Sequence, residues 1–140
     1  MEYIKSGSNY IIRLDRGEEV LETISSLCEK ENIKAGCLLG LGAANDIEIG
    51  IFDTVKKEYY KQSFSVDYEI SALVGNISRQ KGKPYLHFHI TIGNPKEGKF
   101  AAGHLSKCVI SATAEIYLTA VNADVDRKFS EKIGLNLMKF

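Results

Sequence analysis

The sequence predicts an α+β fold: a single domain over residues 1–140, with one main helix near the N-terminus and a mostly antiparallel sheet or barrel. Three observations predict it. The 140 residues suffice for one hydrophobic core and are too few for two comfortable domains. Sustained helical periodicity occurs in one early segment. After residue 34, short apolar runs separated by turns follow one another, which is typical of antiparallel strands.

The helical segment follows a first predicted strand at residues 8–14. Asp15 stands three residues before Glu18, a spacing that resembles a capping box and predicts that the helix begins there. Apolar residues then recur at helical spacing for about four turns, namely Val20, Leu21, Ile24, Leu27 and Cys28. The pattern predicts an amphipathic helix with one face on the core.

Most of the remaining sequence has the short apolar runs that are typical of β-strands. The predicted strands lie at residues 34–42, 46–53, 57–65, 68–78, 85–93 and 107–121. Near the end, residues 126–133 predict a short helix that Gly134 terminates, before a closing strand at 135–140. Gly40 and Gly42 lack the further residues of a nucleotide-binding loop, so they indicate a close approach of two backbones or a β-bulge.

Composition argues against several classes of protein. Eighteen basic residues balance eighteen acidic ones, and none of the four arginines adjoins another, so DNA binding is not expected on charge grounds. The first residues lack the apolar core of a secretory signal, and no apolar run is long enough to span a bilayer. Three cysteines without CxxC spacing indicate free, mostly buried thiols, which favours a cytoplasmic location.

All three histidines of the chain lie within residues 87–104. His87 and His89 share one face of the predicted strand, about 6–7 Å apart along the backbone, while the residues between and beside them form an apolar face. Two imidazoles at this spacing can bind one ion, and His104 is the remaining candidate for a third ligand. Three neutral imidazoles with water are typical of catalytic zinc, although iron, nickel or copper also suit them. The alternative is a solvated strand face and an unrelated His104.

Two carboxylates are candidates for a supporting catalytic role. Glu69 opens the strand at 68–78, and Glu115 lies on the polar face of the strand at 107–121. Either is a candidate to hydrogen-bond a ligand histidine or to act as a general base beside metal-bound water. The alternative for each is a surface or interface carboxylate.

Taken together, these segments resemble the plants-and-prokaryotes-conserved (PPC) domain over nearly the whole chain. Five motifs in the same order carry the resemblance: GxGA at 40–43, E-I-x-x-L-x-G-N-I at 69–77, HxH at 87–89, GHL at 103–105 and A-E at 114–115. The usual GGHL pattern is changed at one position, where Ala102 replaces the first glycine.

The resemblance implies a curved antiparallel sheet, a homotrimer with clefts between subunits, and a metal ion, usually zinc, on residues matching His87, His89 and His104. Acetolactate decarboxylase is similar in fold and has a three-histidine zinc site, which leaves open a lyase or hydrolase activity on a small molecule of unassigned identity. Plant members associate with DNA through an AT-hook, and no such motif occurs here. The alternative function is a non-enzymatic oligomerisation or DNA-associated module.

Overall fold

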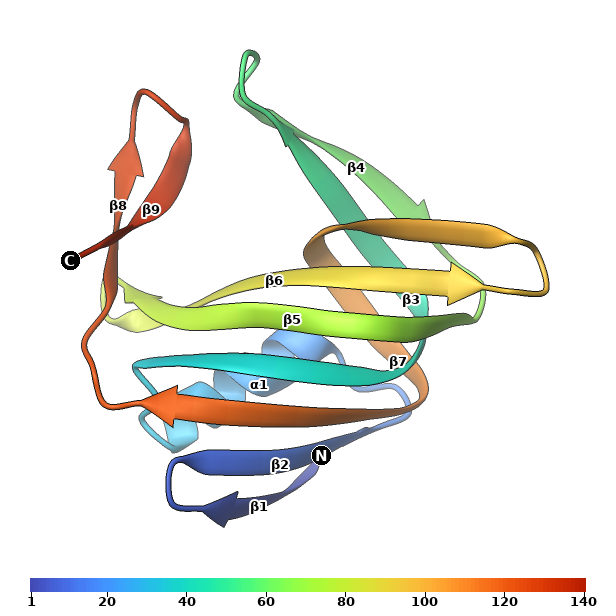
Figure 1. Ribbon diagram of the computed structural model, residues 1–140, viewed down its shortest axis with the longest axis horizontal. Coiled ribbons are helices and arrows are strands. Elements are labelled where there is room, and N and C mark those ends of the chain that lie inside the picture. Colours follow the sequence, from blue (N-terminus) through green and yellow to red (C-terminus); the bar gives the residue numbers. More distant parts are fainter.

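The computed structural model describes all 140 residues as a strongly curved antiparallel sheet that carries one helix on one face (Figure 1). The elements in chain order are β1 (Glu2–Ser6), β2 (Asn9–Asp15), α1 (Val20–Lys30), β3 (Ala35–Asp53), β4 (Glu58–Phe64), β5 (Tyr68–Gln80), β6 (Lys83–Asn94), β7 (Lys99–Val121), β8 (Asp126–Ser130) and β9 (Leu135–Lys139). The predicted α+β class, with its single helix near the N-terminus, is confirmed. No helix combines the length and the apolarity that crossing a membrane requires.

Two long, bent strands organise the sheet. β3 and β7 pair with each other from Ala35 opposite Val121 to Gly50 opposite His104. The β5–β6 hairpin joins them into a closed circuit, because β5 pairs with the first half of β3 and β6 pairs with the start of β7. The β1–β2 hairpin extends the sheet beyond β7, and β4 extends it beyond β3. β3 runs unbroken where two strands were predicted, and β1 was not predicted.

The two glycines of the GxGA motif lie where β3 runs against β7. A Cβ atom on Gly40 would stand 2.9 Å from the backbone oxygen of Glu115, and one on Gly42 would stand 2.4 Å from that of Thr113. The register between β3 and β5 also shifts between these glycines. The predicted close backbone approach is confirmed, because neither position has room for a side chain. The register shift confirms the bulge.

The core lies between the helix and the inner face of the sheet. Helix α1 buries four apolar residues, and β6 presents alternate residues toward the same core; these are Val20, Ile24, Leu27 and Cys28 of α1, and Phe88, Ile90 and Ile92 of β6. The helix has 11 residues, about three turns and not the predicted four. Cys28 and Cys108 are buried free thiols, as expected, and Cys37 is free but exposed. Burial raises the pKa of Cys108 to about 12, so this thiol stays protonated and packs as an apolar group.

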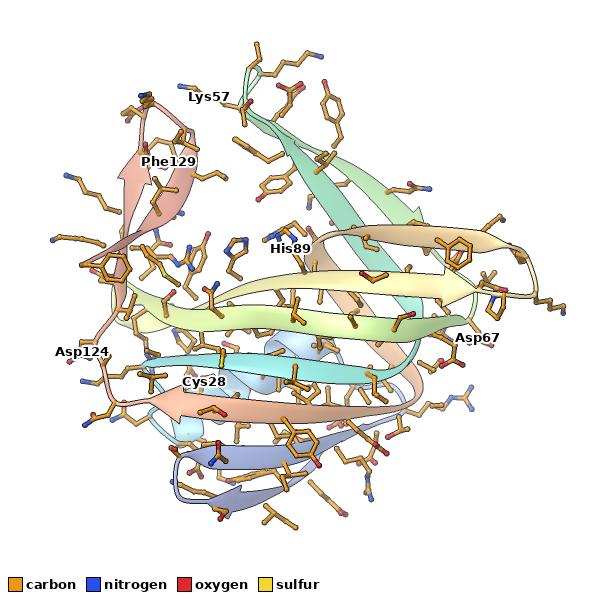
Figure 2. All side chains as sticks on the ribbon, viewed as in Figure 1. Cys28, Lys57, Asp67, His89, Asp124 and Phe129 are labelled. Atoms are coloured by element: carbon orange, nitrogen blue, oxygen red, sulfur yellow. The ribbon has the colours of Figure 1, made fainter.

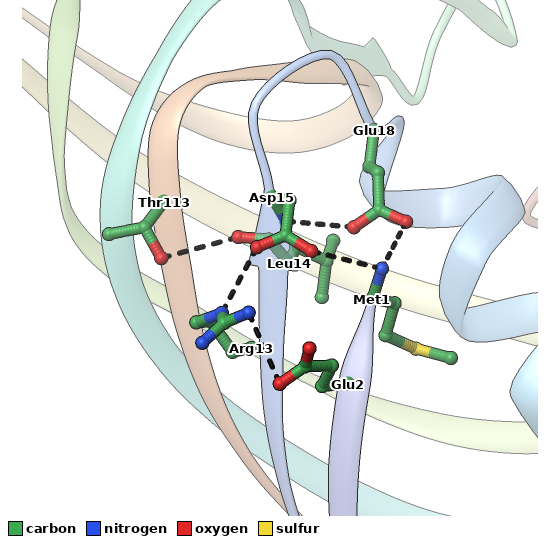
Figure 3. Close-up of polar contacts among 7 residues, drawn as sticks. All are labelled: Met1, Glu2, Arg13, Leu14, Asp15, Glu18 and Thr113. Carbon is green, nitrogen blue, oxygen red and sulfur yellow. Dashed lines mark hydrogen bonds and ion pairs between the residues drawn. The ribbon is translucent and has the colours of Figure 1, made fainter.

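The helix begins later than the capping-box spacing predicted. Asp15 and Glu18 do bond each other: the Asp15 N–H donates to the Glu18 carboxylate at 2.7 Å (Figure 3), and the Glu18 N–H donates to the Asp15 backbone oxygen at 3.2 Å. These contacts close a turn ahead of the helix. The N-cap is Glu19, whose side chain accepts the Glu22 N–H at 2.8 Å. Glu18 also accepts the amine of Met1 at 2.6 Å, which ties β1 to this turn.

The predicted helix at residues 126–133 is wrong, because this segment forms β8 and the turn of a separate two-stranded sheet with β9. The predicted closing strand is confirmed as β9. The segment before β8 is fastened to β5, where the Arg79 N–H donates to the Val125 oxygen at 2.8 Å, and Arg127 reaches β5 side chains from an extended backbone. Gly134 ends the turn with a φ of 88°, the left-handed conformation that glycine adopts readily. These tertiary contacts outweigh a weak local helical pattern.

Candidate metal centre

The three histidines converge on the face of the sheet that points away from the helix, where Figure 2 labels His89. His87 and His89 project from β6, and His104 of β7 stands directly opposite His89 in the β6–β7 pairing. The ring centroids lie 5.3 Å apart for His87–His89, 5.3 Å for His87–His104 and 5.7 Å for His89–His104. One ligand atom from each ring lies within 4.8 Å of the other two. The predicted strand at 107–121 left His104 outside it, whereas β7 already begins at Lys99.

The donor set fits a divalent transition metal. Nitrogen ligands around a tetrahedral zinc ion stand roughly 3.3–3.5 Å apart, which small rotations of the three rings can reach. His104 Nδ1 is buried and has no hydrogen-bond partner in the protein. Burial, followed by the neighbouring His87, His89 and Lys61, lowers the pKa of His104 to about 4. Burial also lowers the pKa of His87. Both rings are therefore neutral at pH 7, the form that binds metals.

A cavity of about 230 Å³ opens beside His87 and His104. Residues from β4, β5, β6, β7 and the β8–β9 hairpin line it, so segments distant in the sequence surround one cavity. The Tyr59 ring of β4 packs against His104, with ring centroids 5.1 Å apart and planes inclined by 33°. Burial raises the pKa of Tyr59, so its hydroxyl stays protonated and can donate a hydrogen bond.

Two hairpins, β3–β4 and β8–β9, rise on the same side of the molecule (Figure 1), and a side chain joins their turns. The side chain of Lys57, in the β3–β4 turn, donates to the backbone oxygen of Glu131 in the β8–β9 turn. The same side chain lies against Gly134, where an added Cβ would stand 3.0 Å from it. The C-terminal hairpin is therefore held at both its base and its tip.

Arg127 of β8 fixes the base of that hairpin and lines the cavity. Its guanidinium donates to Ser78 Oγ at 2.7 Å, to Asn76 Oδ1 at 2.8 Å and to the Asn136 oxygen at 3.0 Å. Its Cζ atom lies 4.3 Å from the centre of the Tyr85 ring. Because Asn76 pairs with His87 across β5 and β6, this network adjoins the histidine cluster.

The structure does not bring Glu69 or Glu115 to the histidines. In β5, the residue opposite His89 is Val74, and Glu69 lies five residues before it. At the rise of a strand, Glu69 and Val74 are about 16 Å apart. Glu115 lies eleven residues beyond His104 in β7 and pairs with Arg13 on β2. Both side chains are exposed, and neither belongs to the cluster of ligand atoms. Within one chain, the register of β5 and β7 separates these two glutamates from the histidines, and their predicted base or supporting role stays a prediction.

Sequence reasoning missed three residues beside the cluster: Tyr59, Asn76 and Arg127. Asn76 had a weak signal, because it shares a strand face with the exposed residues of the E-I-x-x-L-x-G-N-I motif. Tyr59 and Arg127 had none, because their approach depends on how the β3–β4 and β8–β9 hairpins fold back over the sheet.

Comparison with known proteins places these observations in a family. The profile described as the Plants and Prokaryotes Conserved (PCC) domain matches residues 1–122. Among proteins of curated function, none matches this chain.

Three solved structures illustrate the likeness. A proposed DNA-binding protein from Bacteroides thetaiotaomicron has a TM-score of 0.94 and 29% identity over 99% of this chain and 96% of that one. A plant- and prokaryote-conserved (PPC) protein from Pyrococcus horikoshii has a TM-score of 0.87 and 34% identity over 99% and 95%. A metal-containing protein from Archaeoglobus fulgidus has a TM-score of 0.88 and 31% identity over 99% and 97%.

Proposed function

Since the chain belongs to the plants-and-prokaryotes-conserved family, we propose that it is a homotrimeric zinc-binding protein whose three-histidine centre serves a small-molecule site. The convergence of His87, His89 and His104, with a buried Nδ1 atom that has no partner, is the observation that carries this proposal. A relative that is described as metal-containing supports it.

The surroundings of the histidines suit chemistry on a small molecule. Zinc on three neutral imidazoles keeps a position for water or substrate and polarises what it binds. The chain's own residues contribute a cavity beside His87 and His104, with Tyr59 packed on one ligand ring. A hydrolase or lyase is the activity class that this arrangement and the family resemblance favour. Within one chain, Glu69 and Glu115 lie too far from the histidines to act as its general base.

An exposed apolar row on the histidine face supports the homotrimer. Five residues, each 47–67% exposed, occupy successive cross-strand positions: Ile4, Ile11, Tyr117, Leu39 and Val74. The row continues through Val74 to its partner His89, at the edge of the metal centre. A continuous apolar row on a free surface is typical of a protein interface. We assign it to further copies of this chain, which would then border the histidines.

Metal analysis and zinc titration test the metal centre. Protein purified without a histidine tag should bind one zinc per chain by calorimetry. His89→Ala and His104→Ala should each weaken zinc binding at least about 100-fold, because each leaves two ligands. Thr91→Ala is the matched control, since Thr91 is exposed on the same face of β6 and is no ligand. Equal zinc binding by all four proteins would refute the proposal.

DNA association is the second candidate, because a relative with 29% identity is described as a proposed DNA-binding protein. The balanced charge of this chain provides few phosphate contacts and little counterion release. Fluorescence anisotropy with duplex DNA at physiological salt should therefore give only non-specific affinity, about 10⁻⁴ to 10⁻⁶ M. A submicromolar Kd would favour the DNA-associated module.

A further inference from the structure

We propose that the cavity beside the histidine cluster binds a small carboxylate and that Arg127 is the residue that recognises it. The inference rests on the proposed metal-binding function and deepens it by assigning a chemical class to the small molecule. The family profile ends at residue 122, so Arg127 and the hairpin that carries it lie outside the matched domain.

The first observation is a buried cation without a counter-ion. Arg127 is only 9% exposed, and none of the ion pairs of the chain includes it. All three of its acceptors are neutral oxygens, those of Ser78, Asn76 and Asn136. Buried charges in proteins are normally paired, because desolvation costs several kcal/mol per ion. An anion arriving from solution would provide the missing charge.

The second observation is the character of the cavity wall. Ten residues line the cavity, and none of them is Asp or Glu. Arg127 is the one permanent cation among them, and it adjoins the histidines, since its acceptor Asn76 pairs with His87 across β5 and β6. A metal ion on the histidines would add more positive charge to the same space. The electrostatic complement of such a cavity is an anion.

The third observation is that the guanidinium is held in place before any ligand arrives. Three hydrogen bonds and the Tyr85 ring at 4.3 Å fix its plane. Of its five N–H donors, three are used, which leaves one on each terminal nitrogen. A planar guanidinium with two available donors suits a carboxylate, which accepts two parallel hydrogen bonds. The volume of about 230 Å³ is below the roughly 300–1,000 Å³ of sites for drug-sized molecules, so the cavity suits a small ligand.

A purely structural role for Arg127 makes a different prediction. If the side chain served only to hold β8 on β5, the cavity would not distinguish a carboxylate from an uncharged molecule of the same shape. Malonate and malonamide form such a pair, because they differ in charge and have nearly the same size. Inorganic phosphate is the third probe, and it tests whether the cavity prefers a phosphate group to a carboxylate.

The experiment titrates the zinc-free protein at pH 7.5 with malonate, malonamide and phosphate, by calorimetry and by following the Arg127 Nε–H resonance in NMR. We expect malonate to bind at least 10-fold more tightly than the other two and to shift that resonance. Zinc-free protein is used so that the result does not depend on the metal centre. Zinc titration of the same sample tests the metal proposal separately, and adding zinc should tighten malonate binding.

Two variants complete the test. Arg127→Gln should weaken malonate binding at least 10-fold, whereas Lys128→Gln, which removes the same charge from an exposed neighbour on β8, should not change it. If Arg127→Gln loosens the hairpin, the wild-type comparison and the NMR shift still decide the question. Equal binding of malonate and malonamide, tighter binding of phosphate, or an unshifted Arg127 resonance would each overturn the proposal.

Discussion

The two faces of β6 differ in burial and in chemistry although they belong to one strand. Phe88 and Ile92 are completely buried against the helix side, while His87 and His89 point the other way, toward the cavity and the apolar row. The inner face contributes to folding through burial of apolar area. The outer face contributes little packing within one chain. Stability and function should therefore respond to different substitutions only one residue apart.

The largest expected effect comes from truncating the inner face. Phe88→Ala should lower the free energy of unfolding of zinc-free protein by about 3–5 kcal/mol, because it leaves a cavity in the core. His89→Ala should lower it by less than about 1 kcal/mol, because its side chain is exposed. Urea denaturation measures both, and similar losses in the two variants would mean that the faces are not energetically distinct.

The apolar row gives the next largest effect. Leu39→Glu should weaken trimer association at least about 100-fold, because it would bury an unpaired charge at the interface. Light scattering should then report a monomer mass for this variant, whereas the wild type at the same concentration should give the mass of the proposed trimer. Val55→Glu is the control, since Val55 is exposed at the β3–β4 turn and lies outside the row. A monomeric wild type would remove the trimer proposal altogether.

The smallest expected effect is the change in folding stability with pH. It comes from His104, on the histidine face of the sheet, and not from the core face. The pKa of His104 falls from an ordinary value near 6.5 in the unfolded chain to about 4 in the folded one, so the unfolded chain takes up the proton first. The stability contribution of neutral His104 is therefore present above pH 6.5 and is lost as the pH falls toward 4. We expect a loss of about 1 kcal/mol, since the ring is only partly buried.

Thermal unfolding of zinc-free protein between pH 7 and pH 4.5 measures this loss. His104→Gln should flatten the pH dependence, because glutamine cannot titrate, whereas Thr91→Ala should leave it unchanged. A pH profile of the wild type that matches that of His104→Gln would show that the buried imidazole is not linked to folding.

The parts of the fold that were predictable depend on contacts close in sequence. The spacing of Val20, Ile24 and Leu27 predicted α1, because a helix places such residues on one side through its own geometry. The alternation along 85–92 separated the histidines from the core residues in the same way. The hairpin of β8 and β9 was missed because its extended backbone depends on Arg127 reaching Asn76 and Ser78, about fifty residues earlier in the chain.

The sequence by itself determined that His87 and His89 share a polar strand face, that the core lies on the other side of that strand, and that Gly40 and Gly42 mark a close backbone approach. Only the tertiary structure decided that His104 stands opposite His89, that Glu69 and Glu115 lie elsewhere, and that Arg127 joins the site. The physical reason is register. Bulges, bends and the packing of distant segments decide which residues face each other across strands. Local sequence preferences do not predict these features.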